Sequence, residues 1–148
     1  MGLNPQVIGK EMPHGFAGCY ARQPDMIVNT RPAGGGAPIP FGTPLKYDGA
    51  EVVPMGAAAT AAQFVGVAGA EIKSALTYLD QYAPGEPVSV FQRGAINVKC
   101  QRGTPALGGG VYVRITANGS FSTAAVGGFE AEDDSGKVVQ LTNCQWAG

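Results

Sequence analysis

The chain has 148 residues, the size of one domain. Its 10 basic and 11 acidic side chains leave a net charge of -1, so there is no surplus of Lys and Arg that would indicate nucleic-acid binding. Charged residues make up 14% of the chain, against roughly 25% in typical soluble domains, which leaves two interpretations open: an Ala- and Gly-rich β-protein, or an exterior largely covered by neighbouring subunits.

Targeting and metal-binding signals are absent from the sequence. The N-terminus lacks a basic segment followed by an apolar one, and no apolar run approaches the ~18 residues of a membrane span, so we expect neither a signal peptide nor a membrane contact. Cys19, Cys100 and Cys144 are far apart and odd in number, which excludes the usual zinc spacings and fits reduced thiols in a protein made in a cytoplasm. We expect no cofactor.

The first 24 residues differ from the rest of the chain. They contain three prolines and four glycines and show no sustained periodicity. We interpret residues 1–24 as an extended arm with the apolar anchors Met12, Phe16 and Tyr20, because such a segment buries too little by itself to offset its ordering entropy. Residues 25–148 are predicted to form a single β domain.

Short strands separated by turn residues follow along this domain. Apolar and polar residues alternate from Gly85 to Ile115, which is typical of strands with one buried face, and turns are predicted at Arg93-Gly94 and at glycines 108–110. Turn signals also occur at Asp48-Gly49 and Asn118-Gly119. Outside the central stretch, the expected strands are 25–30, 41–47, 51–55, 64–68, 126–132 and 137–143.

Two segments leave their secondary structure open, and three glycines begin a repeated pattern. Residues 56–63 are either one helical turn or a loop, and residues 71–82 are a strand end plus loop or, alternatively, a short helix. Gly42, Gly85 and Gly108 each precede apolar residues at the third and fifth positions, a weak repeat that suggests two related hairpin halves of a sandwich or barrel.

No constellation of residues suggests catalysis. His14 is the only histidine and has no partner adjacent in sequence, and the nucleophile-elbow and phosphate-binding glycine motifs are absent, so we do not expect an enzyme. The acidic residues Glu130, Glu132, Asp133 and Asp134 lack the regular offsets of a cation loop and are interpreted as a solvated loop.

Arginines are the polar residues with the clearest possible role. Gln92-Arg93-Gly94 recurs as Gln101-Arg102-Gly103, and together with Arg22, Arg31 and Arg114 these side chains could bind acidic groups on another protein. The alternative is that they are solvent-facing turn residues. The candidate contact residues are therefore Met12, Phe16, Tyr20, Arg22, Arg31, Arg93 and Arg102.

Several segments together resemble the structural cement, or capsid decoration, proteins of tailed bacteriophages. They are 18–22 (GCYAR), 39–42 (IPFG), 60–68 (TAAQFVGVA), 82–90 (YAPGEPVSV), 92–99 (QRGAINVK) and 110–114 (GVYVR). The resemblance runs from about residue 15 to the end of the chain and is carried by turn and strand positions.

The resemblance implies an all-β, compact jelly-roll or β-barrel-like domain with an extended N-terminal arm. It implies a virion protein that binds the outer surface of the capsid and bridges subunits of the major capsid protein. It also implies self-association, with a homodimer favoured and a trimer as the alternative. A second interpretation is a β-module of a phage tail or fibre that binds glycans on a host surface.

Overall fold

The computed structural model describes residues 15–73 and 79–147, except for the side chains of residues 22–24. This part of the chain is all-β, as predicted, with short 3₁₀ turns at η1 (Ala61–Gln63) and η2 (Gly119–Phe121). No helix in it is long and apolar enough to cross a bilayer. The strands are β1 (Tyr20–Pro32), β2 (Ile39–Pro40), β3 (Pro44–Asp48), β4 (Glu51–Pro54), β5 (Phe64–Ala68), β6 (Gln81–Tyr82), β7 (Pro87–Ile96), β8 (Gly110–Arg114), β9 (Phe129–Glu130) and β10 (Val138–Gln145).

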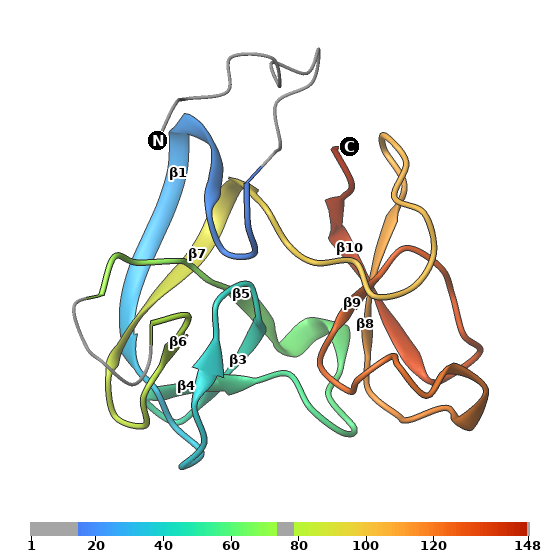
Figure 1. The fold of residues 1–148 in the computed structure, drawn as a ribbon, viewed down its shortest axis with the longest axis horizontal. Coiled ribbons are helices and arrows are strands. Elements are labelled where there is room, and N and C mark those ends of the chain that lie inside the picture. Colours follow the sequence, from blue (N-terminus) through green and yellow to red (C-terminus); the bar gives the residue numbers. More distant parts are fainter. Residues whose placement is uncertain (1–14, 74–78, 148) are drawn as a thin grey trace, which may run out of the picture.

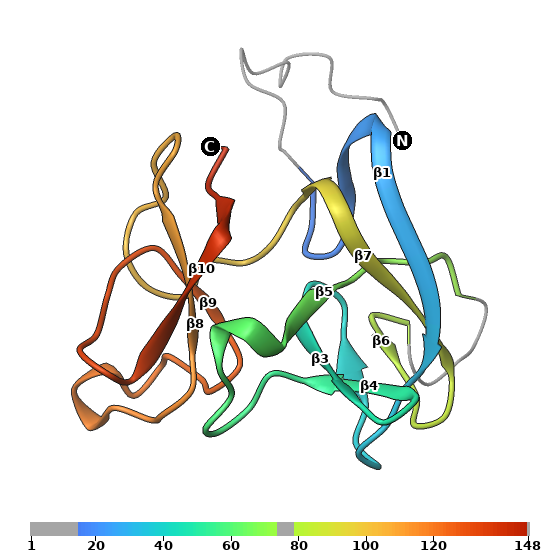
Figure 2. The same ribbon diagram turned by 180° about the vertical axis from the view of Figure 1, so that it is seen from behind.

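The strands form three antiparallel sheets. The largest has the order β1-β7-β5-β3-β4, the second the order β10-β8-β9, and β2 pairs with β6. Figures 1 and 2 show the two larger sheets side by side, with the connection 97–109 running from the end of β7 to β8. None of the sheets closes on itself, so the all-β class is confirmed, whereas a jelly roll or barrel is not.

Strand β5 links two apolar clusters because both of its faces are buried. Ala68 belongs to a cluster with Leu45, Val88 and Val90 beneath the five-stranded sheet. The adjacent Val67 points to the opposite face, into a cluster with residues of β8, β9 and β10. A strand buried on two faces is apolar throughout, which explains the continuous run 64–68 and why this strand was predicted correctly.

Strand β1 is longer than expected and begins earlier. It starts at Tyr20, so residues 20–24 belong to a strand that pairs with β7 and not to an arm. The predicted turn at Arg93-Gly94 is wrong, because both residues continue β7. Between the pairs Arg22–Ala95 and Ile27–Arg93, β1 advances five residues while β7 advances two. The extra residues of β1 form a bulge opposite Gly94, so the glycine that suggested a turn marks a bulge instead.

Other elements also differ from the predictions. Asn118 does not form a hairpin turn; its side chain accepts a hydrogen bond from the Ser120 amide and caps η2. The strand expected over 126–132 is limited to β9. Residues 56–63 contain η1, while the choice between helix and strand for 71–82 falls partly on residues 74–78, outside the described residues.

The glycine repeat has a local structural basis. Gly42, Gly85 and Gly108 have φ values of 79°, 78° and 75°, and each lies two residues before a strand, β3, β7 or β8. A side chain is disfavoured in this left-handed region, so glycine allows the chain to turn directly into each strand. The repeat therefore describes one kind of turn in two different sheets.

We expect Gly66→Ala to destabilise the protein by about 1–3 kcal/mol. A Cβ atom at residue 66 would lie 2.5 Å from the Phe91 carbonyl oxygen and 3.0 Å from Val90 Cγ1, forcing β5 away from β7. Gly119→Ala is the matched control, because a Cβ atom there meets nothing within 4 Å. Chemical denaturation measures both; equal stabilities of the two variants would contradict the expectation.

Candidate functional site

The described chain begins with a β-turn that we call the N-terminal turn, residues 15–19. The Cys19 amide donates to the Phe16 carbonyl over 3.0 Å. The turn is also bound to two other segments: Gly18 N–H donates to the Asn97 carbonyl at 2.8 Å, and Ala70 N–H donates to the Gly18 carbonyl at 2.7 Å. Backbone hydrogen bonds on both sides thus hold the turn against the body of the domain.

Gly18 is the residue that allows this close packing. Its φ is 82°, and a Cβ atom on it would lie 2.9 Å from the Ala68 carbonyl oxygen, the Gly42 nitrogen and Phe41 Cβ. Two of these contacts are with backbone atoms, which cannot move aside without disturbing β5. A larger residue would therefore displace the turn from the domain.

The three predicted apolar anchors are placed differently. Phe16 is 66% exposed on the N-terminal turn. Tyr20 is half-buried, and its ring stacks on Phe91 with 5.3 Å between centroids; burial and the charge of Glu71 raise the pKa of its hydroxyl. Met12 lies outside the described residues. The structure therefore presents Phe16, and not Tyr20, as a free aromatic side chain.

The predicted arginines also separate into different settings. Arg31 is exposed, and Arg93 is exposed with Asp25 as its partner, 3.3 Å away. The side chain of Arg22 lies outside the described part, although its backbone pairs with Ala95. Arg102 keeps only 12% of its side chain exposed and binds carboxylates of its own chain. Its role as a contact for another protein stays a prediction.

A polar row lies across the five-stranded sheet. Asn29 on β1 donates to the Gln92 side-chain oxygen on β7, and Gln92 Nε2 donates to the Tyr47 hydroxyl on β3 over 3.2 Å. Tyr47 is 44% exposed, and Ile27 on β1 is 47% exposed. This face thus offers both apolar surface and hydrogen-bonding groups to a neighbour.

Lys73 connects the parts of the chain that precede and follow residues 74–78. Its ammonium lies 2.5 Å from a carboxylate oxygen of Glu86 and donates to the Gln81 carbonyl at 2.6 Å, and only 7% of the side chain is exposed. The hydrogen bond from Lys73 lowers the pKa of Glu86. Ile72, next to Lys73, is fully exposed, so an apolar side chain stands beside a fixed anchor.

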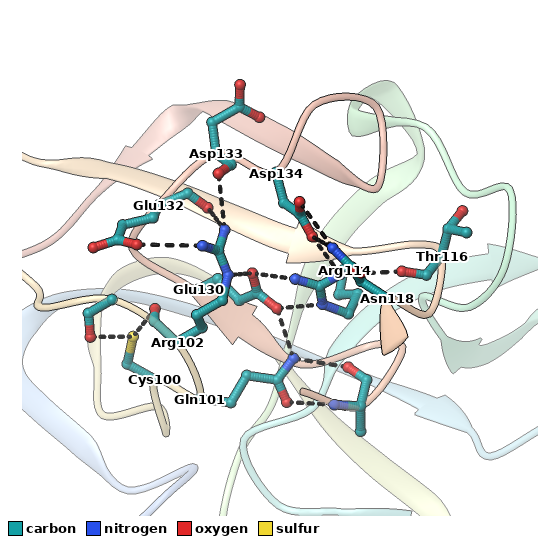
Figure 3. Close-up of polar contacts among 12 residues, drawn as sticks. Cys100, Gln101, Arg102, Arg114, Thr116, Asn118, Glu130, Glu132, Asp133 and Asp134 are labelled. Carbon is teal, nitrogen blue, oxygen red and sulfur yellow. Dashed lines mark hydrogen bonds and ion pairs between the residues drawn. The ribbon is translucent and has the colours of Figure 1, made fainter. Parts of the chain in front are cut away.

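A buried ion network occupies the three-stranded sheet (Figure 3). Arg114 at the end of β8 and Glu130 on β9 are both 0% exposed and form a bidentate pair, with 2.5 Å from Nε to Oε1 and 2.9 Å from Nη2 to Oε2. Arg102 Nε reaches Glu130 Oε2 at 2.7 Å, and Arg114 Nη1 reaches Asp134 Oδ2 at 2.8 Å. Each buried charge thus has a charged partner. The expectation that Arg114 could bind acidic groups on another protein is therefore wrong, because its guanidinium is buried against Glu130 and Asp134 of its own chain.

Further hydrogen bonds complete the network. Gln101 Nε2 donates to Glu130 Oε1 at 3.1 Å, and Asn118 Nδ2 donates to both carboxylate oxygens of Asp134. Arg102 also donates to the carbonyls of residues 132 and 133, and its guanidinium lies 4.8 Å from the centroid of the Phe121 ring. The network ties the connection 97–109, β8, β9 and the loop after β9 into one unit.

The network determines how its carboxylates ionise. Burial alone would raise the pKa of Glu130, but hydrogen bonds from Arg114, Arg102 and Gln101 outweigh it, so that pKa is lowered. Hydrogen bonds from Asn118 and then Arg114 lower the pKa of Asp134. The ionised forms are therefore the ones that the folded chain stabilises.

This arrangement corrects the interpretation of the acidic residues as a solvated loop. Glu130 is fully buried, and the Asp134 side chain is only 14% exposed. The sequence did contain a signal: Arg114 follows the apolar residues of β8 and Glu130 directly follows a buried Phe129, both unusual places for a charge. The pairing itself depends on β8 and β9 being neighbours, which the sequence did not reveal.

We expect Glu130→Gln to cost about 3–5 kcal/mol of unfolding free energy at pH 7, because two guanidinium groups lose their buried counter-charge. In the wild type, the contribution of Glu130 is fully present above the ordinary carboxyl pKa of about 4.3 and is lost as the pH falls through the lower pKa of the folded state. The variant should therefore lose less stability than the wild type between pH 5 and pH 3.

Thermal or denaturant unfolding at several pH values measures this difference. Glu132→Gln is the control, since 60% of that side chain is exposed and its pair with Arg102 should contribute less than about 1 kcal/mol. A Glu130→Gln protein as stable as the wild type at pH 7, or one with the same acid sensitivity, would show that the network does not support the fold.

Comparison with known proteins gives the family. Residues 4–148 match the model of the family described as structural cement protein (E217 gp24/Pam3 gp6). No curated protein matches the chain. The match covers nearly the whole chain and agrees with the resemblance of its turn and strand segments. The chain belongs to the family of phage structural cement proteins.

Proposed function

We propose that this cement protein binds the outer surface of a phage capsid and stabilises the shell by bridging subunits of the major capsid protein, with Phe16 as a central anchor. The observation that carries this proposal is a 66% exposed phenylalanine on a turn that backbone hydrogen bonds hold on both sides. The family membership supports a structural role in the virion and association with capsid proteins. This family is one of structural phage proteins and is not a class of enzymes.

Rigidity makes Phe16 a good anchor. An aromatic side chain buried at an interface contributes more than most other residues, and interface energy is concentrated in a few such positions. A side chain displayed on a fixed turn also loses little backbone entropy on binding. The tight packing of Gly18 against Ala68 and Gly42 provides that fixed position.

The rest of the contact surface is proposed to combine apolar side chains with arginines. Its apolar part is proposed to include Ile72 and Leu79, which are both exposed, and Arg31 and Arg93 are exposed on the five-stranded sheet. Arginine suits this role because its guanidinium binds carboxylates in a bidentate manner and is weakly hydrated. Met12, Tyr20, Arg22 and Arg102 complete the proposed contacts, as expected from the sequence.

Self-association is part of the proposal, with a homodimer favoured over a trimer. An oligomer that contacts several capsid subunits at once gains strength through effective concentration, even when each contact is weak. The low proportion of charged residues supports this, because fewer charges must be desolvated when surfaces meet. No observation on the described surface favours the alternative of a glycan-binding tail or fibre module.

We expect Phe16→Ala to weaken attachment to capsids assembled without the cement protein by about 30-fold, the loss that corresponds to about 2 kcal/mol at a binding hot spot. Co-sedimentation of protein with capsids, quantified by gel densitometry over a range of concentrations, gives the affinity. The melting temperature should stay unchanged, because Phe16 is exposed.

Leu107→Ala serves as the matched control, since Leu107 is 81% exposed and lies in the connection before β8. Sedimentation velocity of each variant without capsids shows whether Phe16 contacts another copy of this protein instead. Full occupancy of the capsid by Phe16→Ala at wild-type concentrations would overturn the role assigned to this residue.

A further inference from the structure

The outer edge of β1 has no strand partner among the described residues. β1 stands at the end of the order β1-β7-β5-β3-β4 and pairs with β7 on one side (Figures 1 and 2). Residues 29–32 are all exposed. An uncovered edge of this kind presents N–H and C=O groups with which a strand of another molecule can pair. The edge of β1 is therefore a candidate site for the addition of a strand.

The hydrogen bond of Ala33 determines which backbone groups of β1 reach this edge. In an antiparallel pair, alternate residues direct both N–H and C=O toward the partner strand, and the residues between them direct both groups away. Ala33 N–H donates to the Glu86 carbonyl at 2.8 Å, so Ala33 is directed toward β7. The pairing from Val28 to Pro32 has no register shift. Counting back from Ala33, Val28 and Thr30 therefore direct their N–H and C=O groups to the free edge.

Two contacts support this assignment at Thr30. Its partner on β7, Ser89, accepts a hydrogen bond from Gly69 N–H at 2.8 Å, and Gly69 follows β5, on the side of β7 away from β1. The Thr30 carbonyl accepts a long hydrogen bond, 3.5 Å, from the guanidinium of the neighbouring Arg31. The backbone of Thr30 is therefore directed away from β7, and a second strand can replace this one weak contact.

Other contacts define where the free edge begins and ends. Gly34 N–H donates to the Val52 carbonyl of β4 at 2.9 Å, so the chain is paired again just after Pro32, which itself has no N–H. At the other end, a Cβ atom at Gly94 would lie 2.6 Å from the Asp25 carbonyl oxygen, so that carbonyl is directed toward β7. The alternation thus holds from Asp25 to Pro32, and the free edge lies between these two residues.

The side chains along this edge are complementary to themselves. The exposed side chains on one face of β1 alternate along the strand and are Asp25, Ile27, Asn29 and Arg31. A two-fold axis through Val28 places Asp25, three residues before it, opposite Arg31 of a second copy, three residues after it. Symmetry repeats this ion pair on the other side of the axis. Opposite charges directly across an antiparallel pair stabilise it.

Asp25 can accept this second guanidinium. Arg93 of its own chain lies 3.3 Å from the Asp25 carboxylate, yet the Asp25 side chain stays 77% exposed. A carboxylate has about four lone-pair sites, so it can bind two guanidinium groups at once. The charges of the edge thus favour a second copy of β1 over a strand that lacks matching charges.

We propose that β1 pairs in antiparallel fashion with β1 of a second copy, with the two-fold axis at Val28, so that two five-stranded sheets join into one. The inference rests on the self-association proposed above and identifies the surface that provides it. A contact that uses the same edge of both molecules closes at two copies, which accounts for a homodimer and not a trimer. It also assigns Arg31 to self-association.

Sedimentation velocity of the full-length protein without capsids, over a range of concentrations, measures the dimer dissociation constant. Thr30→Pro removes the N–H that Thr30 directs to the free edge and should weaken the dimer at least about 30-fold, because the loss occurs twice by symmetry. Folding should survive, since this N–H is not used by β7. Thr30→Ala is the matched control: it keeps the N–H and should leave the dissociation constant unchanged.

Charge reversal tests the register without touching the backbone. Arg31→Asp and Asp25→Arg each place like charges opposite one another at two symmetry-related positions, and each should weaken the dimer about tenfold. The double variant restores opposite charges and should recover most of the wild-type affinity. Asp48→Arg is the control, because it makes the same charge change as Asp25→Arg at an exposed site at the end of β3; it should leave the dissociation constant unchanged.

Several results would overturn the inference. A wild type that is monomeric at its highest soluble concentration, or a trimer, would do so. A dimer that neither Thr30→Pro nor the charge reversals weaken would place the self-contact on another surface. A monomer that loses capsid attachment on Thr30→Pro would show that a capsid segment occupies the edge. A wild-type dimer that depends on this edge but does not co-sediment with capsids would overturn the capsid-binding proposal alone.

Discussion

The pairing of two fully buried charges, Arg114 and Glu130, is the interaction on which much of this structure depends. Neither group could be buried alone, because an unpaired charge in the interior costs several kcal/mol. Arg102 extends the pair into the connection 97–109, where Asn97 in turn holds the N-terminal turn through backbone hydrogen bonds. The same connection thus fixes the three-stranded sheet at one end and the turn that displays Phe16 at the other.

A second constraint is the double burial of β5. Val67 and Ala68 point into different apolar clusters, so the two larger sheets share one strand as a common element of their cores. Gly66 and Gly18 then bring neighbouring backbone segments into contact distances that no side chain would permit. This dense packing suits a structural protein, whose contacts with neighbours lose least entropy when its own surface is rigid.

The internal ion pairs also change the meaning of the low charge content. Arg102, Arg114, Glu130, Asp134 and Lys73 all direct their charges to partners within the chain. The surface is therefore poorer in free charge than the composition alone indicates. An exterior with few free charges and several exposed apolar residues can meet another protein at a low desolvation cost, which agrees with membership of a cement protein family.

The sequence by itself determined the all-β class, the strands β4 and β5, and the family, because alternating or continuous apolar runs and glycine turns are local signals that neighbouring strands only reinforce. It also indicated Phe16, although not that the side chain stands on a turn with fixed backbone contacts. Only the tertiary structure decided that β7 continues through Gly94 and that Glu130 is buried. Both depend on a partner distant in sequence: the bulge of β1 lies about seventy residues before Gly94, and the guanidinium of Arg102 lies 28 residues before Glu130. Pairing across such separations has no local signature in the chain.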